Sequence, residues 1–129
     1  MGKRYLLDSN TIIDYIAGLY SGKAKQWLNH IIDEEIIVSV ITKIEVLSFD
    51  PDKEDNYPIL VDFFEASTIL ELSDSVVNKT IAIRQKQKIK LPDSVIASTA
   101  LVNELVLISR NTKDFRTIPD LEVINPYDI

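Results

Sequence analysis

The sequence contains no cysteine and a single histidine, His30, and these two absences remove most kinds of catalytic site. Thiol nucleophiles, zinc sites and histidine general bases all need side chains that this chain does not have. Glycine and proline are scarce too, with three and five residues, and neither forms a run that would mark a linker. His30 lies in a helical segment without another His or any Cys and is predicted to be a surface or packing residue. The chemistry left open is that of carboxylates.

The chain is long enough to bury one hydrophobic core, and we expect a single domain over residues 1–129. Hydrophobic residues make up 46% of the 129 positions, which is ordinary for a globular domain. No apolar segment is long enough to cross a bilayer, and the first residues lack the pattern of a signal peptide. We therefore expect a cytoplasmic protein with no membrane partner.

The net charge of −6 argues against a surface that binds nucleic acid over most of its area, because Lys and Arg make the phosphate contacts. Five basic residues nevertheless fall in one short stretch: Lys79, Arg84, Lys86, Lys88 and Lys90. Such a strip beside an acidic metal site fits an enzyme that cuts RNA, but it is also typical of a solvated helix face. Both interpretations stay open.

Short apolar runs alternate with segments of helical periodicity along the chain. Strands are predicted at 5–7, 36–41, 68–72, 105–108 and 121–124. Helices are predicted at 11–17, 22–33, 57–66, 75–87 and 93–103, with another that opens at 42. Strands separated by helices of this length imply right-handed crossovers and a mainly parallel sheet with helices on both faces. The predicted fold class is α/β, a three-layer α/β/α sandwich with about five strands.

Four acidic residues are predicted to meet at one edge of this sheet. Asp8 follows the first strand directly, and Glu45 lies one helical turn beyond the second. Asp114 lies just beyond the 105–108 strand, whereas Asp93 opens a helix and depends on the fold to bring it near the others. Ligands of open parallel sheets bind outside the carboxyl ends of the strands, so these side chains are expected to converge there.

Each of these acids also stands where a helix cap stands. Asp8 and Asp93 lie at helix starts, and the pairs Thr42–Glu45 and Asn111–Asp114 have the spacing of capping partners. For any one acid, capping explains the residue as well as catalysis does. The two roles are compatible, because a helix N-terminus offsets part of the repulsion between clustered carboxylates.

A cluster of carboxylates without His or Cys is a hard, oxygen-lined site, which suits Mg²⁺ or Mn²⁺ and disfavours zinc. Such an ion can orient a water and stabilise the charge that develops on a phosphate during in-line attack. Ser9 and Asn111 are candidates for neutral hydrogen bonds to a water or a phosphate, although turn formation explains both residues equally well.

Four sequence motifs resemble the acidic motifs of PIN domains, in the order and spacing of VapC-type toxins. They are LLDSNTIIDY, TKIEVL, LPDSVIASTA and LISRNTKDF followed by LEVINP, and together they cover nearly the whole chain. The resemblance implies that Asp8, Glu45, Asp93 and Asp114 bind one or two divalent ions, with Ser9 and Asn111 assisting. The sequence departs from the family pattern at Ser109, where the family more often has Thr; both side chains carry a hydroxyl. The implied function is Mg²⁺-dependent cleavage of RNA by the toxin of a type II toxin–antitoxin pair.

Three alternatives remain at this level. A PIN nuclease that processes RNA outside a toxin pair, or an RNA-binding PIN module without activity, has the same fold. A haloacid-dehalogenase-like phosphatase also begins with a strand that ends in Asp, but it needs a second acid where Asn10 stands.

The acidic stretch FDPDKEDNYP lacks the glycine and the closing glutamate of a calcium-binding loop, and is predicted to be a solvated connection.

Partners follow from the resemblance and not from composition. It implies an RNA substrate, a cognate antitoxin protein and self-association as a homodimer. Tyr15, Tyr20 and Trp27 are candidates for such an interface, with a core role favoured for Trp27.

Overall fold

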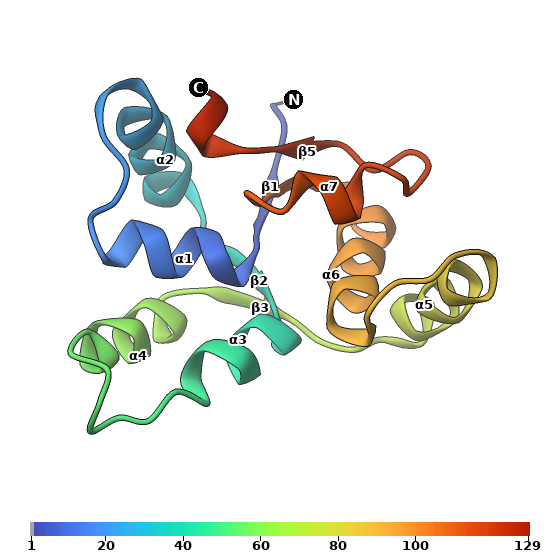
Figure 1. The fold of residues 1–129 in the computed structure, drawn as a ribbon, viewed down its shortest axis with the longest axis horizontal. Coiled ribbons are helices and arrows are strands. Elements are labelled where there is room, and N and C mark those ends of the chain that lie inside the picture. Colours follow the sequence, from blue (N-terminus) through green and yellow to red (C-terminus); the bar gives the residue numbers. More distant parts are fainter. Residues whose placement is uncertain (1) are drawn as a thin grey trace.

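The structure is a computed structural model that describes residues 2–129 (Figure 1). Five short strands occur in chain order: β1 (Tyr5–Leu7), β2 (Ile37–Ser39), β3 (Thr68–Leu70), β4 (Val106–Ile108) and β5 (Val123–Ile124). They alternate with helices α1 (Ser9–Ile16), α2 (Gly22–Glu34), α3 (Val40–Leu47), α4 (Tyr57–Glu65), α5 (Asp74–Lys86), α6 (Leu91–Val102) and α7 (Thr112–Phe115), and a 3-10 helix (Pro126–Asp128) ends the chain. Within residues 2–129, every helix is too short or too polar to span a bilayer.

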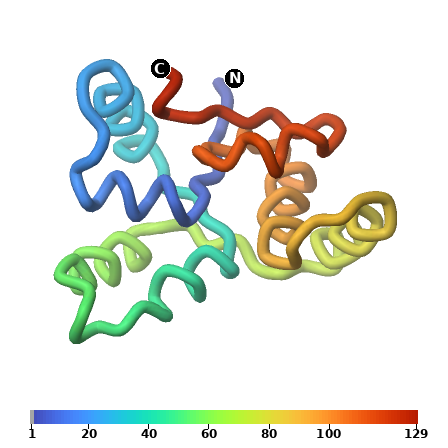
Figure 2. The backbone as a smooth tube through the Cα atoms, viewed as in Figure 1, coloured from blue at the N-terminus to red at the C-terminus, as the bar shows by residue number. Residues whose placement is uncertain are grey.

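All strand pairs are parallel, as the alternation of strands and helices predicts. β4 pairs with β1 on one side and with β5 on the other, and β2 pairs with β3. β2 also lies beside β1, so the two hydrogen-bonded groups follow one another in the order β3-β2-β1-β4-β5. The N-terminal segment runs close to the C-terminal one, where Lys3 Nζ lies 3.0 Å from a carboxylate oxygen of Glu122 (Figure 2).

The strands divide the apolar residues between two cores because consecutive side chains of a strand point to opposite faces. In β1, Leu7 packs in a core with α1, α2 and α4, whereas Leu6 packs in a second core with α5, α6 and α7. β4 repeats the division, with Ile108 in the first core and Leu107 in the second. Helices therefore cover both faces of the strands, which confirms the three-layer α/β/α arrangement.

The start of α3 corrects two sequence-based expectations. The strand predicted at 36–41 ends at Ser39, because the Ser39 hydroxyl accepts a hydrogen bond from the backbone N–H of Ile41 at 3.2 Å and caps a helix that begins at Val40. Thr42 is consequently buried inside the helix, and the expected Thr42–Glu45 capping box is wrong. The apolar run of Val40 and Ile41 belongs to a buried helix start, which periodicity alone does not separate from a buried strand.

The tyrosines proposed for a partner surface differ in exposure. Tyr20 is buried and its ring packs against Tyr127, with ring centroids 4.7 Å apart. The prediction that Tyr20 lies on a partner surface is therefore wrong. Trp27 is partly buried against the first core and meets Tyr5 edge to face at 5.7 Å, in line with the core role favoured for it. Tyr15 is partly buried.

Candidate active site

The carboxyl edge of the sheet carries Asp8 and Ser109, which follow the neighbouring strands β1 and β4. Leu7 and Ile108 are partners in the parallel register, so the next residue of each strand stands at the same edge. The Asp8 backbone N–H donates to the carbonyl of Ile108 at 3.0 Å and continues this pairing. Because the strands end together, the polar residues that follow them are brought face to face.

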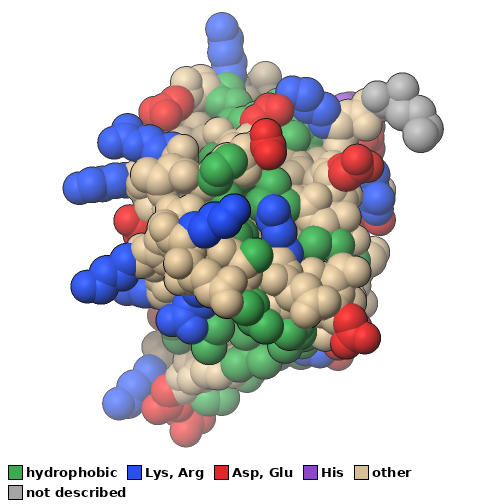
Figure 3. Space-filling model, turned by 90° about the vertical axis from the view of Figure 1, so that its right-hand side faces the viewer, with side chains coloured by type: hydrophobic (Ala, Val, Ile, Leu, Met, Phe, Trp, Pro, Cys, Tyr) green, Lys and Arg blue, Asp and Glu red, His purple; other side chains and the backbone are tan. Residues whose placement is uncertain are grey.

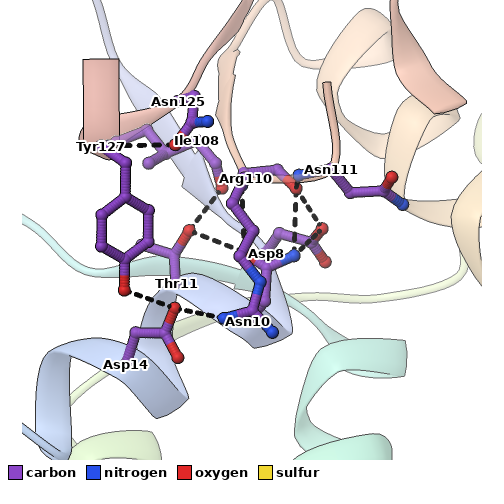
Figure 4. A network of polar contacts seen from close by, with 10 residues as sticks. Asp8, Asn10, Thr11, Asp14, Ile108, Arg110, Asn111, Asn125 and Tyr127 are labelled. Carbon is purple, nitrogen blue, oxygen red and sulfur yellow. Dashed lines mark hydrogen bonds and ion pairs between the residues drawn. The ribbon is translucent and has the colours of Figure 1, made fainter. Parts of the chain in front are cut away.

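The Asp8 carboxylate is buried and held entirely by neutral donors (Figure 4). It accepts hydrogen bonds from the Ser9 backbone N–H at 2.8 Å, the Ser109 hydroxyl at 2.8 Å and the Asn10 side-chain amide at 3.3 Å. The bond from Ser9 makes Asp8 the cap of α1, so the capping role expected of it is confirmed. Only 5% of the residue is exposed.

Burial raises the pKa of the Asp8 carboxyl, and the nearby carboxylates of Asp93 and Glu45 raise it further. The hydrogen bonds from Ser109 and Ser9 act in the opposite direction, because they favour the charged form. Burial of a carboxylate beside other acids, with only neutral hydrogen-bond donors, is costly unless a positive charge offsets it.

Glu45 reaches the same edge from α3. Its side chain is exposed, and it accepts a hydrogen bond of 2.9 Å from the hydroxyl of Ser9, the first residue of α1. Ser9 therefore touches two of the expected acids, donating to Asp8 from its backbone and to Glu45 from its side chain. This position favours the orienting role predicted for Ser9 over that of a simple turn residue.

Asp93 is the third residue of α6, after Lys90 at the cap position and Pro92 in the first turn. Its side chain makes no hydrogen bond to the other acids, but it lies within electrostatic reach of all three. Its pKa is raised by partial burial first and then by the carboxylates of Asp114 and Glu45, while the Lys90 ammonium lowers it. The fold does bring Asp93 to the cluster.

Asp114 lies in α7, a helix of four residues that the sequence did not predict. The Asn111 side-chain amide donates to Asp114 at 3.0 Å, and the Asn111 backbone N–H donates to the Ser109 hydroxyl at 3.0 Å. Ser109 thus joins Asn111 to Asp8. The pairing of Asn111 with Asp114 is confirmed, but neither side chain caps a backbone N–H of α7.

Capping explains only one of the four acids, since Asp8 alone accepts a backbone N–H at a helix start. As the side chains stand, no three acidic, His or Cys groups among residues 2–129 are close enough to share one ion. The donor set nevertheless fits Mg²⁺, because all four groups offer oxygen and the most buried one, Asp8, forms no ion pair with a basic side chain of residues 2–129. Glu45 and Asp114 are exposed, so they are free to turn toward an ion.

A second polar network lies behind this site and was not predicted from the sequence (Figure 4). Asp14, near the end of α1, is buried and binds the guanidinium of Arg110 at 2.6 Å and the hydroxyl of Tyr127 at 2.9 Å. The backbone N–H of Arg110 donates to Asn10 at 3.1 Å. The network therefore fixes the loop between Ser109 and Asn111 to α1. In the sequence, the only sign of this network is that the polar residues SRN directly follow a buried strand.

Acids and basic groups outside the cluster behave as expected. Asp50 and Asp52 lie in an exposed turn in which the Asp50 carboxylate accepts from the Asp52 backbone N–H at 3.0 Å. His30 is exposed and lies 3.3 Å from Glu34 on the same helix. Among the described residues, Asp50, Asp52 and His30 form no hydrogen bond or ion pair with a residue of the Asp8 edge.

The fold and sequence match known proteins over most of their length. A profile of the PIN domain matches residues 5–121. A chain of a toxin–antitoxin complex from Klebsiella pneumoniae is 30% identical with a TM-score of 0.75, and the match covers 97% of this chain and 99% of that one. No curated protein matches the sequence significantly.

Two further structures share the fold over the same extent. A chain of FitAcB from Neisseria gonorrhoeae is 26% identical with a TM-score of 0.73, and a chain of DNA-bound VapBC from Salmonella typhimurium is 20% identical with a TM-score of 0.80. Each match covers 97% of this chain and 99% of the other. The resemblance seen in the sequence motifs is confirmed: the chain belongs to the PIN-domain family.

Proposed function

We propose that this chain is a Mg²⁺-dependent endoribonuclease that hydrolyses phosphodiester bonds of RNA. The observation that carries the proposal is the buried Asp8 carboxylate, which lies near the carboxylates of Asp93 and Glu45 and forms no ion pair with a basic side chain of residues 2–129. A divalent ion bound there would offset the negative charge, and Mn²⁺ has the same preference for oxygen ligands as Mg²⁺. Membership of the PIN-domain family supports this reading over that of a phosphatase.

Asp8, Glu45, Asp93 and Asp114 are the proposed ion ligands. When bound there, Mg²⁺ supplies charge that stabilises the phosphate during attack by water. The residues of the chain have the task of orientation: Ser109 and Asn10 fix the Asp8 carboxylate, Ser9 fixes Glu45, and Asn111 fixes Asp114. Ser9 and Asn111 have further hydrogen-bonding capacity for a water or a phosphate oxygen.

The proposed biological role is that of the toxin in a toxin–antitoxin pair, held by an antitoxin and associated as a homodimer. Support comes from the Klebsiella pneumoniae chain, since 30% identity over nearly the whole length of both chains joins it to a toxin–antitoxin complex. This role predicts a neighbouring gene for a small protein that co-purifies with this chain, and the absence of such a gene would argue against it.

The test is cleavage of single-stranded RNA by the purified chain with and without divalent ions. We expect cleavage in Mg²⁺ or Mn²⁺ and none in excess EDTA. The substitutions E45Q, D93N and D114N are each expected to reduce the rate more than about tenfold, as loss of groups that hold or orient a metal does. D50N and D52N remove the same charge from an exposed turn and serve as controls. Undiminished cleavage in EDTA, or equal losses in the controls, would reject the proposed site.

A further inference from the structure

Beside the acidic cluster lies a hollow of about 340 Å³ that carries both signs of charge. Asp93 and Asp114 line it together with three lysines, Lys88, Lys90 and Lys113. Lys88 and Lys90 belong to the connection between α5 and α6, whereas Lys113 comes from α7, so the fold assembles them from distant parts of the sequence.

The connection that bears Lys88 and Lys90 is held in place from two sides. The Arg84 side chain donates to the carbonyl of Ile89 at 3.4 Å, between the two lysines. On the other side, the hydroxyl of Thr117 donates to the Gln87 side chain at 2.9 Å. The backbone positions of these lysines are therefore fixed before any ligand binds, which reduces the ordering cost of binding.

The three ammonium groups form no ion pair with an acidic side chain of the described residues. The ion pairs formed within residues 2–129 involve Lys3, Arg4, His30 and Arg110, and none of them includes a lysine of the hollow. Lys90 acts on Asp93 from a distance, since its charge opposes the rise in the pKa of that carboxyl. In a chain with a net charge of −6, uncompensated cations at the rim of the acidic cluster are available for an anionic ligand.

We propose that Lys88, Lys90 and Lys113 bind backbone phosphates of single-stranded RNA adjacent to the phosphodiester that is cut. This inference rests on the proposed function, which supplies RNA as the substrate. The lining residues of the hollow, all within the described chain, include no aromatic ring for base stacking. Ammonium groups bind phosphates as point charges, so this contact positions the strand and reads no sequence.

The structure divides the basic strip of the sequence into two sets. Lys88 and Lys90 reach the hollow beside Asp93, but Lys79 and Lys86 line a different hollow that contains none of the four clustered acids. Figure 3 views the side of the molecule that carries α5, and shows Lys and Arg side chains mostly along the left edge with a few over the middle. Lys79 and Lys86 therefore offer a control of two lysines outside the hollow, for comparison with the three lysines inside it.

The experiment compares the variants K88Q/K90Q/K113Q and K79Q/K86Q with the unchanged chain. Binding of a fluorescein-labelled single-stranded RNA is measured by anisotropy in EDTA over a series of salt concentrations. Each phosphate contact contributes a slope of roughly 0.7 to the plot of log affinity against log salt, so the triple variant is expected to lower the slope by about two. The control variant is expected to leave it nearly unchanged. Thermal melts check that each variant is folded.

A second measurement separates this inference from the proposed function. In Mg²⁺, the triple variant is expected to raise KM with little change in kcat, because it removes contacts made equally before and during the reaction. Cleavage by the triple variant with unchanged KM and salt slope overturns the phosphate site while the nuclease stands. RNA binding that is lost in the triple variant, in a chain that never cleaves, upholds the contact between these lysines and RNA phosphates and rejects the nuclease together with the placement beside a cut bond. No RNA binding by the unchanged chain, or an altered oligomeric state of the triple variant, also overturns the inference.

Discussion

Two buried carboxylates lie near opposite ends of α1, and their partners differ in charge. Asp14 is 3% exposed and meets the guanidinium of Arg110 at 2.6 Å. Asp8 is 5% exposed and accepts hydrogen bonds only from the neutral groups of Ser9, Asn10 and Ser109. Burial of a charge is costly unless an opposite charge or a metal offsets it, so Asp14 is balanced within the chain and Asp8 is not.

The comparison separates a structural acid from a functional one. Arg110 satisfies Asp14 and, through its backbone N–H, holds Asn10, which in turn donates to Asp8. Asp14, whose charge Arg110 offsets, therefore supports the loop that orients Asp8. The carboxylates of Asp93 and Glu45 lie near Asp8 and increase the cost of its charge, and Asp114 does the same for Asp93, so a divalent cation bound at this edge would stabilise the folded state.

The largest contrast is expected when each carboxylate is replaced by its amide. D8N removes a proposed ion ligand and is expected to lower Mg²⁺-dependent cleavage by at least about a hundredfold. Loss of a residue that only orients a metal ligand costs up to about a hundredfold, and loss of the ligand itself should cost no less. D14N leaves Arg110 without its counter-charge, but the Arg110 side chain is 53% exposed and water offsets part of the loss. We expect D14N to lower the free energy of unfolding by about 1–3 kcal/mol. RNA cleavage assays and urea titrations measure the two effects.

The assignment is reversed if D14N abolishes cleavage in a fully folded protein while D8N retains it. Equal losses of stability in the two variants, each with activity intact, would show that both acids are structural. Comparing cleavage below the denaturation midpoint of D14N keeps unfolding from imitating a catalytic effect.

A smaller contrast is expected when the hydroxyl that donates a hydrogen bond to each carboxylate is removed. S109A removes the donor to Asp8 and is expected to weaken Mg²⁺ affinity by about 10–100-fold, as loss of an orienting partner of a metal ligand does. Y127F removes the donor to Asp14 and is expected to cost about 0.5–1.5 kcal/mol of stability without changing Mg²⁺ affinity. The Mg²⁺ dependence of cleavage and of the melting temperature measures both. A Y127F variant with weakened Mg²⁺ binding would show that the Asp14 network tunes the ion site directly.

Much of the fold follows from the sequence pattern because it depends on local periodicity. The alternation of apolar strands and amphipathic helices was sufficient to predict a parallel α/β sandwich, and the strand ends placed Asp8 at its carboxyl edge. The boundary at Ser39 was missed because an uninterrupted apolar run suits a buried strand and a buried helix start equally. The four-residue helix α7 was missed for a related reason, since it is too short to show a period.

The acids of the candidate site were predictable, but their supports were not. Asp8, Glu45, Asp93 and Asp114 follow from strand ends and from family motifs. The contacts of Asn10 and Ser109 with Asp8 depend on the register of β1 and β4, a long-range property that no local pattern contains. The same holds for Asp14, Arg110 and Tyr127, which are separated by most of the chain and meet only in the folded protein.

The smallest expected effect concerns Asp93, which is partly buried in the first turn of α6 and faces Asp114 and Glu45. Its pKa in the folded state is raised above the unfolded value of about 3.9. Between those two values the folded state holds more protons than the unfolded state, so stability falls as pH rises through this window. We therefore expect the metal-free D93N variant to be at least as stable as the unchanged chain at neutral pH, and this advantage to disappear as pH is lowered toward 4.

Thermal melts in EDTA at low salt test this expectation, and Asp74 supplies the control. Asp74 is an exposed acid in the first turn of α5 that belongs to no cluster, so D74N is expected to lose about 0.3–1 kcal/mol of favourable interaction with the helix dipole at neutral pH. Added Mg²⁺ should raise the melting temperature of the unchanged chain and of D74N, and that of D93N much less, because an ion that binds only the folded state stabilises it by mass action. If D93N instead behaves like D74N, with lower stability without metal and a full Mg²⁺ shift, Asp93 serves its helix and not the ion.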